Sequence, residues 1–135
     1  MQSWEPVEVL SISGLEADHD FLRRLFGRSK WNLVAARSCV EGLRLLRRNP
    51  LRVIVCERDL PDGRWRDLWD SLASLSSRPP LIVTSLHADN CLWAEVLNLG
   101  GYDVLAKPLA AQEVLRVVTA AWERIPRQAA PVRAA

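Results

Sequence analysis

"LRVIVCERDLPDG", residues 51–63, joins an apolar, β-branched run to a charged loop that contains Pro and Gly. The run is the most continuous of its kind in the chain, so it predicts a strand buried on both faces of a parallel sheet. Pro and Gly then favour a turn. The strand ends at Glu57, which places an acid at the carboxyl edge of the predicted sheet.

The rest of the chain alternates strands with helices in the same way. Further strands are predicted at 7–13, 31–36, 81–85 and 102–106, and amphipathic helices at 18–27, 38–48, 65–75, 89–99 and 110–123. Five such units predict an α/β fold, a doubly wound five-stranded parallel sheet between helices. Functional groups gather at the carboxyl ends of the strands in such folds. The residues at these strand ends are Ser13, Gly14, Glu57, Thr84, Ser85 and Lys107.

Composition limits the class of protein. The chain has 135 residues, 49% hydrophobic and 25% charged, which is typical of one globular domain, here placed at 1–125 with a disordered tail at 126–135. No apolar run approaches the roughly 20 residues of a membrane span, and no signal peptide is indicated, so we expect a cytoplasmic protein without a membrane partner. The net charge of +2 favours solvated helix faces over a nucleic-acid interface.

Catalytic and metal signatures are weak. Cys39, Cys56 and Cys91 are odd in number and lie among apolar neighbours, which favours reduced core thiols over disulfides or a zinc site. His19 and His87 have no recognisable partners, and no Gly-rich phosphate loop follows the first strand. The sequence therefore does not predict an enzyme.

Three segments together resemble a known family, the receiver domain of bacterial two-component response regulators. They are "VIVCERDLPDG" (53–63), "LIVTS" (81–85) and "LGGYDVLAKP" (99–108), set in the five-fold β/α rhythm. The resemblance implies the flavodoxin-like, or CheY-like, (βα)5 sandwich. It also implies a histidine kinase or an output protein as partner, and phosphoryl transfer to an aspartate at the end of the third strand.

Three family positions are matched in kind. Glu57 falls on the phospho-acceptor position, Thr84 on the hydroxyl position and Lys107 on the lysine position. The resemblance also implies a cis peptide between Lys107 and Pro108. Glutamate, however, stands where the family has aspartate.

Three further positions are substituted. The acidic pair that holds Mg²⁺ in the family falls on Ser13 and Gly14, and the aromatic switch residue falls on Val104, while Tyr102 lies at the wrong alternation to replace it. Because Ser and Gly supply no carboxylate, we expect no cofactor and no Mg²⁺.

Nearby acids have simpler interpretations. Glu16, Asp18 or Asp20 could reach back to the site, but Asp18 and Asp20 are better explained as cap and dipole partners of the first helix. Asp59 is another candidate acceptor, for which capping of the "DLPDG" loop is the stronger interpretation.

Two interpretations of Glu57 stay open. It is either a permanent anion that imitates the phosphorylated state, paired with Lys107 and hydrogen-bonded to Thr84, or a relict ion pair with Lys107. We expect a stand-alone receiver that acts as a protein-interaction module without conventional Asp phosphorylation. The alternative is a phospho-responsive receiver that uses non-standard acids.

The predicted helix at 89–99 has an apolar arc of about 160°, wider than one packed face needs. The expected interface comprises Trp93, Val96, Leu97 and Tyr102, and a homodimer through the fourth helix, fifth strand and fifth helix is one use of it. The alternative is that Trp93 only covers the edge of the core. Core positions are expected for Trp65, Trp69 and Trp122.

Overall fold

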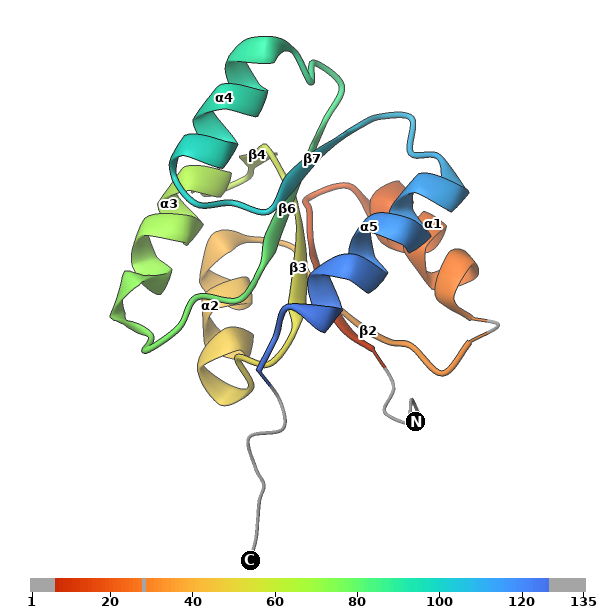
Figure 1. Ribbon diagram of the computed structural model, residues 1–135, viewed down its shortest axis with the longest axis horizontal. Coiled ribbons are helices and arrows are strands. Elements are labelled where there is room, and N and C mark those ends of the chain that lie inside the picture. Colours follow the sequence, from red (N-terminus) through yellow and green to blue (C-terminus); the bar gives the residue numbers. More distant parts are fainter. Residues whose placement is uncertain (1–6, 28, 127–135) are drawn as a thin grey trace, which may run out of the picture.

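The computed structural model describes residues 7–27 and 29–126, and its centre is one five-stranded parallel sheet (Figure 1). The strand order is β2-β1-β3-β6-β7. The strands are β1 (Glu8–Ile12), β2 (Asn32–Ala36), β3 (Val53–Glu57), β6 (Leu81–Ser85) and β7 (Asp103–Ala106). The predicted α/β fold is confirmed, with the run at 53–57 as the central strand.

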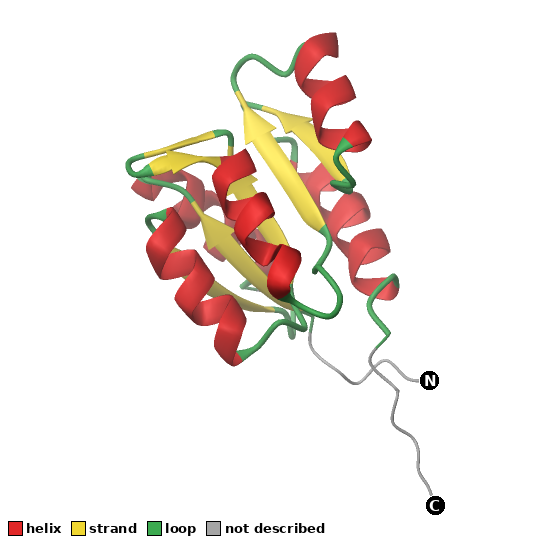
Figure 2. Ribbon diagram, turned by 90° about the vertical axis from the view of Figure 1, so that its left-hand side faces the viewer, coloured by secondary structure: helices red, strands yellow, loops and turns green. Residues whose placement is uncertain are grey.

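Helices cover both faces of the sheet (Figures 1 and 2). On one face lie α1 (Glu16–Phe26) and α5 (Ala111–Glu123), and on the other lie α2 (Cys39–Arg48), α3 (Trp65–Ser71) and α4 (Asn90–Asn98). The helix predicted at 65–75 is shorter, because a 3₁₀ turn, η1 (Leu72–Ser74), follows α3.

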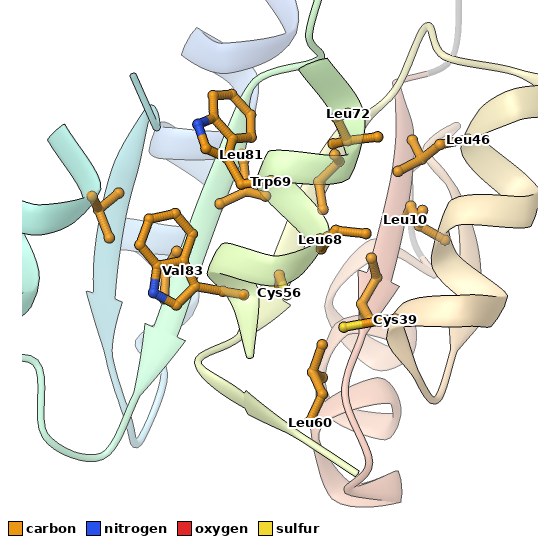
Figure 3. Close-up of a cluster of buried hydrophobic side chains, with 14 of the residues drawn as sticks. Leu10, Cys39, Leu46, Cys56, Leu60, Leu68, Trp69, Leu72, Leu81 and Val83 are labelled. Atoms are coloured by element: carbon orange, nitrogen blue, oxygen red, sulfur yellow. The ribbon is translucent and has the colours of Figure 1, made fainter. Parts of the chain in front are cut away.

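Two hydrophobic clusters fill the space between sheet and helices. Along β3, Ile54 and Cys56 enter the cluster under α2, α3 and α4, while Val53 and Val55 enter the cluster under α1 and α5. Figure 3 shows the first cluster, in which Trp69 of α3 lies with side chains of β6 and β3. This alternation explains why the strand reads as a continuous apolar run.

Three cysteines were expected in the core, and one of them is not there. Cys39 and Cys56 are buried and free, as expected, but Cys91 is exposed on α4. It lies in the first turn of a helix whose buried residues are Leu92 and Val96, so its side chain faces outward.

The loop after β3 contains a hairpin that the sequence did not predict. Strands β4 (Asp59–Leu60) and β5 (Gly63–Arg64) pair antiparallel, and Leu60 packs into the core. Asp62, in the turn, accepts hydrogen bonds from the backbone N–H groups of Cys39 (2.8 Å) and Val40 (3.1 Å). The hairpin therefore caps the start of α2.

Ser38 and Glu41, three residues apart at the start of α2, form a capping box in altered form. Ser38 Oγ accepts from the N–H of Glu41 at 3.1 Å, as expected for an N-cap. The carboxylate of Glu41, however, accepts from the N–H of Arg37 at 2.8 Å instead of from Ser38. Together with Asp62, these bonds satisfy several of the free N–H groups at the helix start.

Asp62→Ala is expected to lower the free energy of unfolding by about 1 kcal/mol at pH 7, the usual cost of a lost helix cap. The N–H of Cys39 and that of Val40 lower the pKa of Asp62. Its contribution is therefore present at neutral pH and is lost as the pH falls through the lowered pKa. Urea denaturation at pH 7 and pH 3 measures both effects. Asp70→Ala, an exposed acid on α3, serves as control, and an equal loss in it would contradict the capping role.

Two expectations concern the ends of the chain and the membrane. The tail predicted at 126–135 lies, apart from Pro126, outside the described residues. In the described ranges, no helix is both long and apolar enough to cross a membrane.

Candidate functional site

The carboxyl edge of the sheet brings together side chains that are far apart in the sequence. Glu57 is the last residue of β3 and pairs in register with Thr84 of β6, while Ser13 directly follows β1 and Lys107 directly follows β7. Parallel strands end at the same edge, so the four side chains surround one small region.

Lys107 is the centre of this site. Its Nζ donates to Glu57 Oε1 and, at 2.7 Å, to Asp18 Oδ2. All three side chains are mostly buried, with exposed fractions of 9% for Lys107, 13% for Glu57 and 17% for Asp18. The predicted pair of Glu57 and Lys107 is present, but it is part of a triad.

Asp18 also belongs to the site, although the sequence favoured another role for it. It was interpreted as a helix cap, yet the N-cap of α1 is Leu15 and carries no side-chain cap bond. Asp18 instead accepts from Ser13 Oγ at 2.6 Å and from Lys107. Its position in the first turn of α1, just after β1, was the available signal, because that turn begins near the carboxyl edge.

The other two acids of this segment point elsewhere. Asp20 pairs with Arg23 at 3.0 Å, and Glu16 pairs with Arg23 at 2.9 Å and with Arg37 at 2.7 Å. These are exposed surface ion pairs, so neither acid belongs to the site.

The positions of the family's acidic pair are occupied by a bonded serine and a tightly packed glycine. Ser13 Oγ donates to Asp18 and accepts from the N–H of Leu15 at 3.0 Å. A Cβ on Gly14 would lie 2.9 Å from Cγ of Pro61. An acid at position 14 would therefore require the ring of Pro61 to shift.

His19 is a buried residue of α1 that contacts β1 and the residue that follows it. The sequence suggested no partner for it, but it is fully buried, with Nδ1 2.8 Å from Ser11 Oγ and Nε2 2.9 Å from the carbonyl oxygen of Ser13. In the neutral ring Nε2–H donates to the carbonyl and Nδ1 accepts from the hydroxyl. His19 thus ties β1 to α1 and positions Ser13 beside Asp18.

One ammonium serves two carboxylates in the site. Burial raises the pKa of Glu57, the hydrogen bond from Lys107 acts against this, and the charge of Asp18 adds to the increase. Burial acts to lower the pKa of Lys107, but its bonds to Asp18 and Glu57 outweigh burial and the pKa is raised. With all three groups ionised, the site carries one net negative charge. The raised pKa of Glu57 reflects this excess charge together with its burial.

Of the remaining predictions for the site, the hydrogen bond between Thr84 and Glu57 is wrong and the cis peptide before Pro108 is confirmed. Thr84 is buried, but in the described part of the chain its hydroxyl makes no hydrogen bond to Glu57. Val104 is buried in the cluster under α2, α3 and α4. The peptide between Lys107 and Pro108 is cis, as the resemblance implied.

Asp59 does not cap the loop that contains it. It is exposed on β4, 3.8 Å from Arg64, and the capping role belongs to Asp62.

The exposed apolar surface of α4 is narrower than predicted. Trp93 and Leu97 are 41% and 43% exposed, but Val96 is fully buried and is wrong as an interface residue. Val96 lies in the core because it faces the sheet together with Leu92. Tyr102 is half-buried.

The three tryptophans assigned to the core are indeed there. Trp65 is fully buried, and Trp69 and Trp122 are nearly so.

A doubly wound (βα)5 sheet with an acid, a hydroxyl and a lysine at its carboxyl edge defines the class of signalling receiver modules. The family model described as "Response regulator receiver domain" matches residues 16–119. The chain belongs to this family, whose members are signalling modules of two-component systems that interact with kinases or output proteins.

Individual relatives agree with this assignment. The chain is 26% identical over 102 residues to the response regulator protein PilR of Pseudomonas aeruginosa, a match over 76% of this chain and 23% of that protein. The chain thus spans about a quarter of the length of this relative.

Solved structures share the fold at low identity. The receiver domain of the Francisella response regulator 1452 has a TM-score of 0.80 at 24% identity, covering 89% of this chain and 98% of that one. The signal receiver domain of an HD domain-containing protein from Pseudomonas fluorescens Pf-5 has a TM-score of 0.80 at 23% identity, covering 91% of each chain.

Proposed function

We propose that this receiver domain is a protein-interaction module of a bacterial two-component pathway that works without conventional Asp phosphorylation. The observation that carries the proposal is the triad, in which Lys107 already binds both Glu57 and Asp18. A permanent anion at the acceptor position, held by the lysine, replaces a charge that phosphorylation would supply. A cytoplasmic location and the absence of an enzymatic activity are part of the same proposal.

The donor set argues against a resident Mg²⁺. The ion prefers octahedral oxygen ligation with one or two carboxylates. Here both carboxylates contact an ammonium, Ser13 has no carboxylate, and a side chain on Gly14 would require Pro61 to shift. Within residues 7–27 and 29–126, no three His, Cys, Asp or Glu side chains are grouped so as to hold a metal ion. We therefore propose signalling without Mg²⁺.

One observation favours the alternative, a phospho-responsive receiver with non-standard acids. Asp18 and Glu57 contact the same Lys107, so two carboxylates lie close together even though the usual acidic pair is missing. If a divalent cation displaced the ammonium, it would meet both of them.

The exposed apolar side chains of α4 suggest where a partner binds. Trp93 and Leu97 are four residues apart and lie on one face of the helix, and Leu86, before the helix, is 69% exposed. A histidine kinase, an output protein or a second copy of the chain would bury this surface. This contact does not require a phosphoryl group in our proposal.

The first test is the intact mass of the protein after incubation with acetyl phosphate and Mg²⁺. We expect no phosphoryl adduct on the natural protein, because the acceptor is engaged by Lys107 and metal ligands are missing. An adduct on the natural protein would support the phospho-responsive alternative, and mapping it to Glu57 or Asp18 would identify the acceptor.

A restored variant provides the positive control. Ser13→Asp, Gly14→Asp and Glu57→Asp return the family residues, and Pro61→Ala removes the ring that would meet the new side chain at position 14. We expect this variant to gain one phosphoryl group. A restored variant that folds but stays unmodified would show that features outside these positions disable the reaction.

A further inference from the structure

A second polar site lies at the opposite, amino edge of the sheet. A pocket of about 360 Å³ lies where β6 and β7 begin. Its walls come from the end of α5, from α3 and from the two loops before these strands. The lining residues are Trp69, Arg78, Pro79, Pro80, Gly100, Gly101, Tyr102 and Arg124.

Two arginines face this pocket on aromatic supports. The guanidinium of Arg78 lies 4.5 Å from the ring centre of Trp69, and that of Arg124 lies 5.6 Å from the ring centre of Tyr102. Such stacking orients a guanidinium while leaving its N–H groups free at the edge. Both arginines also line a smaller neighbouring hollow of about 140 Å³.

The two charges have no counter-charge in the pocket. Across the described ranges neither guanidinium takes part in an ion pair or donates a side-chain hydrogen bond. No Asp or Glu is among the lining residues. The pocket therefore presents two cations and no anion.

The other polar groups of the wall are mostly satisfied. Trp69 Nε1 donates to the carbonyl oxygen of Leu99 at 2.7 Å. The amides of Gly100 and Gly101 donate to Leu97 and Val96. The two guanidiniums are consequently the main donors for a ligand.

From this arrangement we infer a binding site for a small organic phosphate. A guanidinium binds phosphate through paired N–H groups, and a phosphate monoester carries roughly −1.5 to −2 charges at pH 7, which matches two arginines. The volume lies within the range of small-molecule sites and leaves space for an organic group beside the phosphate. The ligand would contact the loop between α4 and β7.

The test is a titration of the full ¹⁵N-labelled chain, followed by NMR at the amides of Gly100 and Gly101 and the Nε–H groups of Arg78 and Arg124. The probes are adenosine 5′-monophosphate, inorganic phosphate and adenosine at constant ionic strength. We expect saturable shifts with the nucleotide at least tenfold tighter than with phosphate, and none with adenosine. Absent shifts, equal binding of adenosine, or nucleotide binding no tighter than phosphate would each overturn the proposal.

Matched variants separate recognition from general charge. Arg78→Gln and Arg124→Gln should each weaken nucleotide binding about tenfold or more, since each removes a charged donor pair. Arg78→Lys keeps the charge but loses the planar fork and should also bind more weakly. Arg47→Gln, an exposed arginine in the last turn of α2, should bind like the natural protein. If Arg47→Gln weakened nucleotide binding as much as Arg78→Gln, the effect would come from net charge alone and the proposed site would be refuted.

Discussion

Lys107→Met is expected to lower the free energy of unfolding by about 3 kcal/mol at pH 8. The variant removes the one cation that serves Glu57 and Asp18, whose side chains are only 13% and 17% exposed. Two mostly buried carboxylates would then lie close together without a cation, and only Asp18 would keep a hydrogen bond, from Ser13. Because the methionine keeps the length and the apolar stem of lysine, the loss reports the missing ammonium and not a cavity.

The pH dependence of this variant follows from the same charges. Burial already raises the pKa of Glu57 with Lys107 present, and the lysine acts against that increase. Without the lysine the pKa rises further, so the folded variant binds a proton at a pH where the unfolded chain does not. Folding then becomes more favourable as the pH falls toward 4.5, and the deficit against the natural protein should shrink between pH 8 and pH 5.

Chemical denaturation at both pH values measures these effects. Glu57→Gln is the matched control, since it keeps the side-chain shape and leaves Lys107 paired with Asp18, and we expect a loss of about 1 kcal/mol or less. The double variant Lys107→Met and Glu57→Gln should recover part of the loss. If Lys107→Met were as stable as the natural protein at pH 8, the buried triad would have no energetic role.

Trp65→Ala is the second large effect, with an expected loss of about 3 to 5 kcal/mol. Trp65 is the largest of the fully buried side chains, and it begins α3 directly after the hairpin. The backbone N–H of Trp65 also donates to the carbonyl oxygen of Arg58 at 2.9 Å. This backbone hydrogen bond fixes the position from which the side chain enters the core. Truncation leaves a cavity that the sheet cannot close.

Two controls make this test specific. Trp65→Phe retains most of the buried area and should cost clearly less than the alanine variant. Trp93→Ala removes the same side chain from α4, where it is 41% exposed, and should cost less than about 1 kcal/mol. Similar losses for Trp65→Ala and Trp93→Ala would contradict the assignment of one tryptophan to the core and the other to the surface.

The predictable part of this molecule rests on periodicity. A continuous apolar run such as 53–56 is typical of a strand buried on both faces of a parallel sheet, and five repeats of strand and helix leave few other ways to bury such strands. The same pattern placed Glu57, Thr84 and Lys107 at one edge, because parallel strands end together. The hairpin at 59–64 was missed because pairs of two residues carry no periodicity.

The wrong assignments share a cause. Val96 and Leu97 are neighbours with similar hydropathy, and only the packing of α4 against the sheet decides that the first is buried and the second exposed. Cys91 is exposed for the same reason. One partner of His19 is Ser11 of β1, eight residues earlier in the chain, and no local sequence pattern predicts this contact.

The sequence by itself determined the parallel sheet, the alternation of strands with helices, and the carboxyl edge as the place of the functional residues. These features follow from the hydrophobic periodicity and the direction of the strands. Only the tertiary structure decided which carboxylates meet Lys107. Asp18 looked like a helix cap because a first-turn aspartate usually serves the helix to which it belongs. It joins Glu57 because the turn after β1 brings α1 over the strand ends, where its carboxylate accepts a hydrogen bond from Lys107, 89 residues further along the chain.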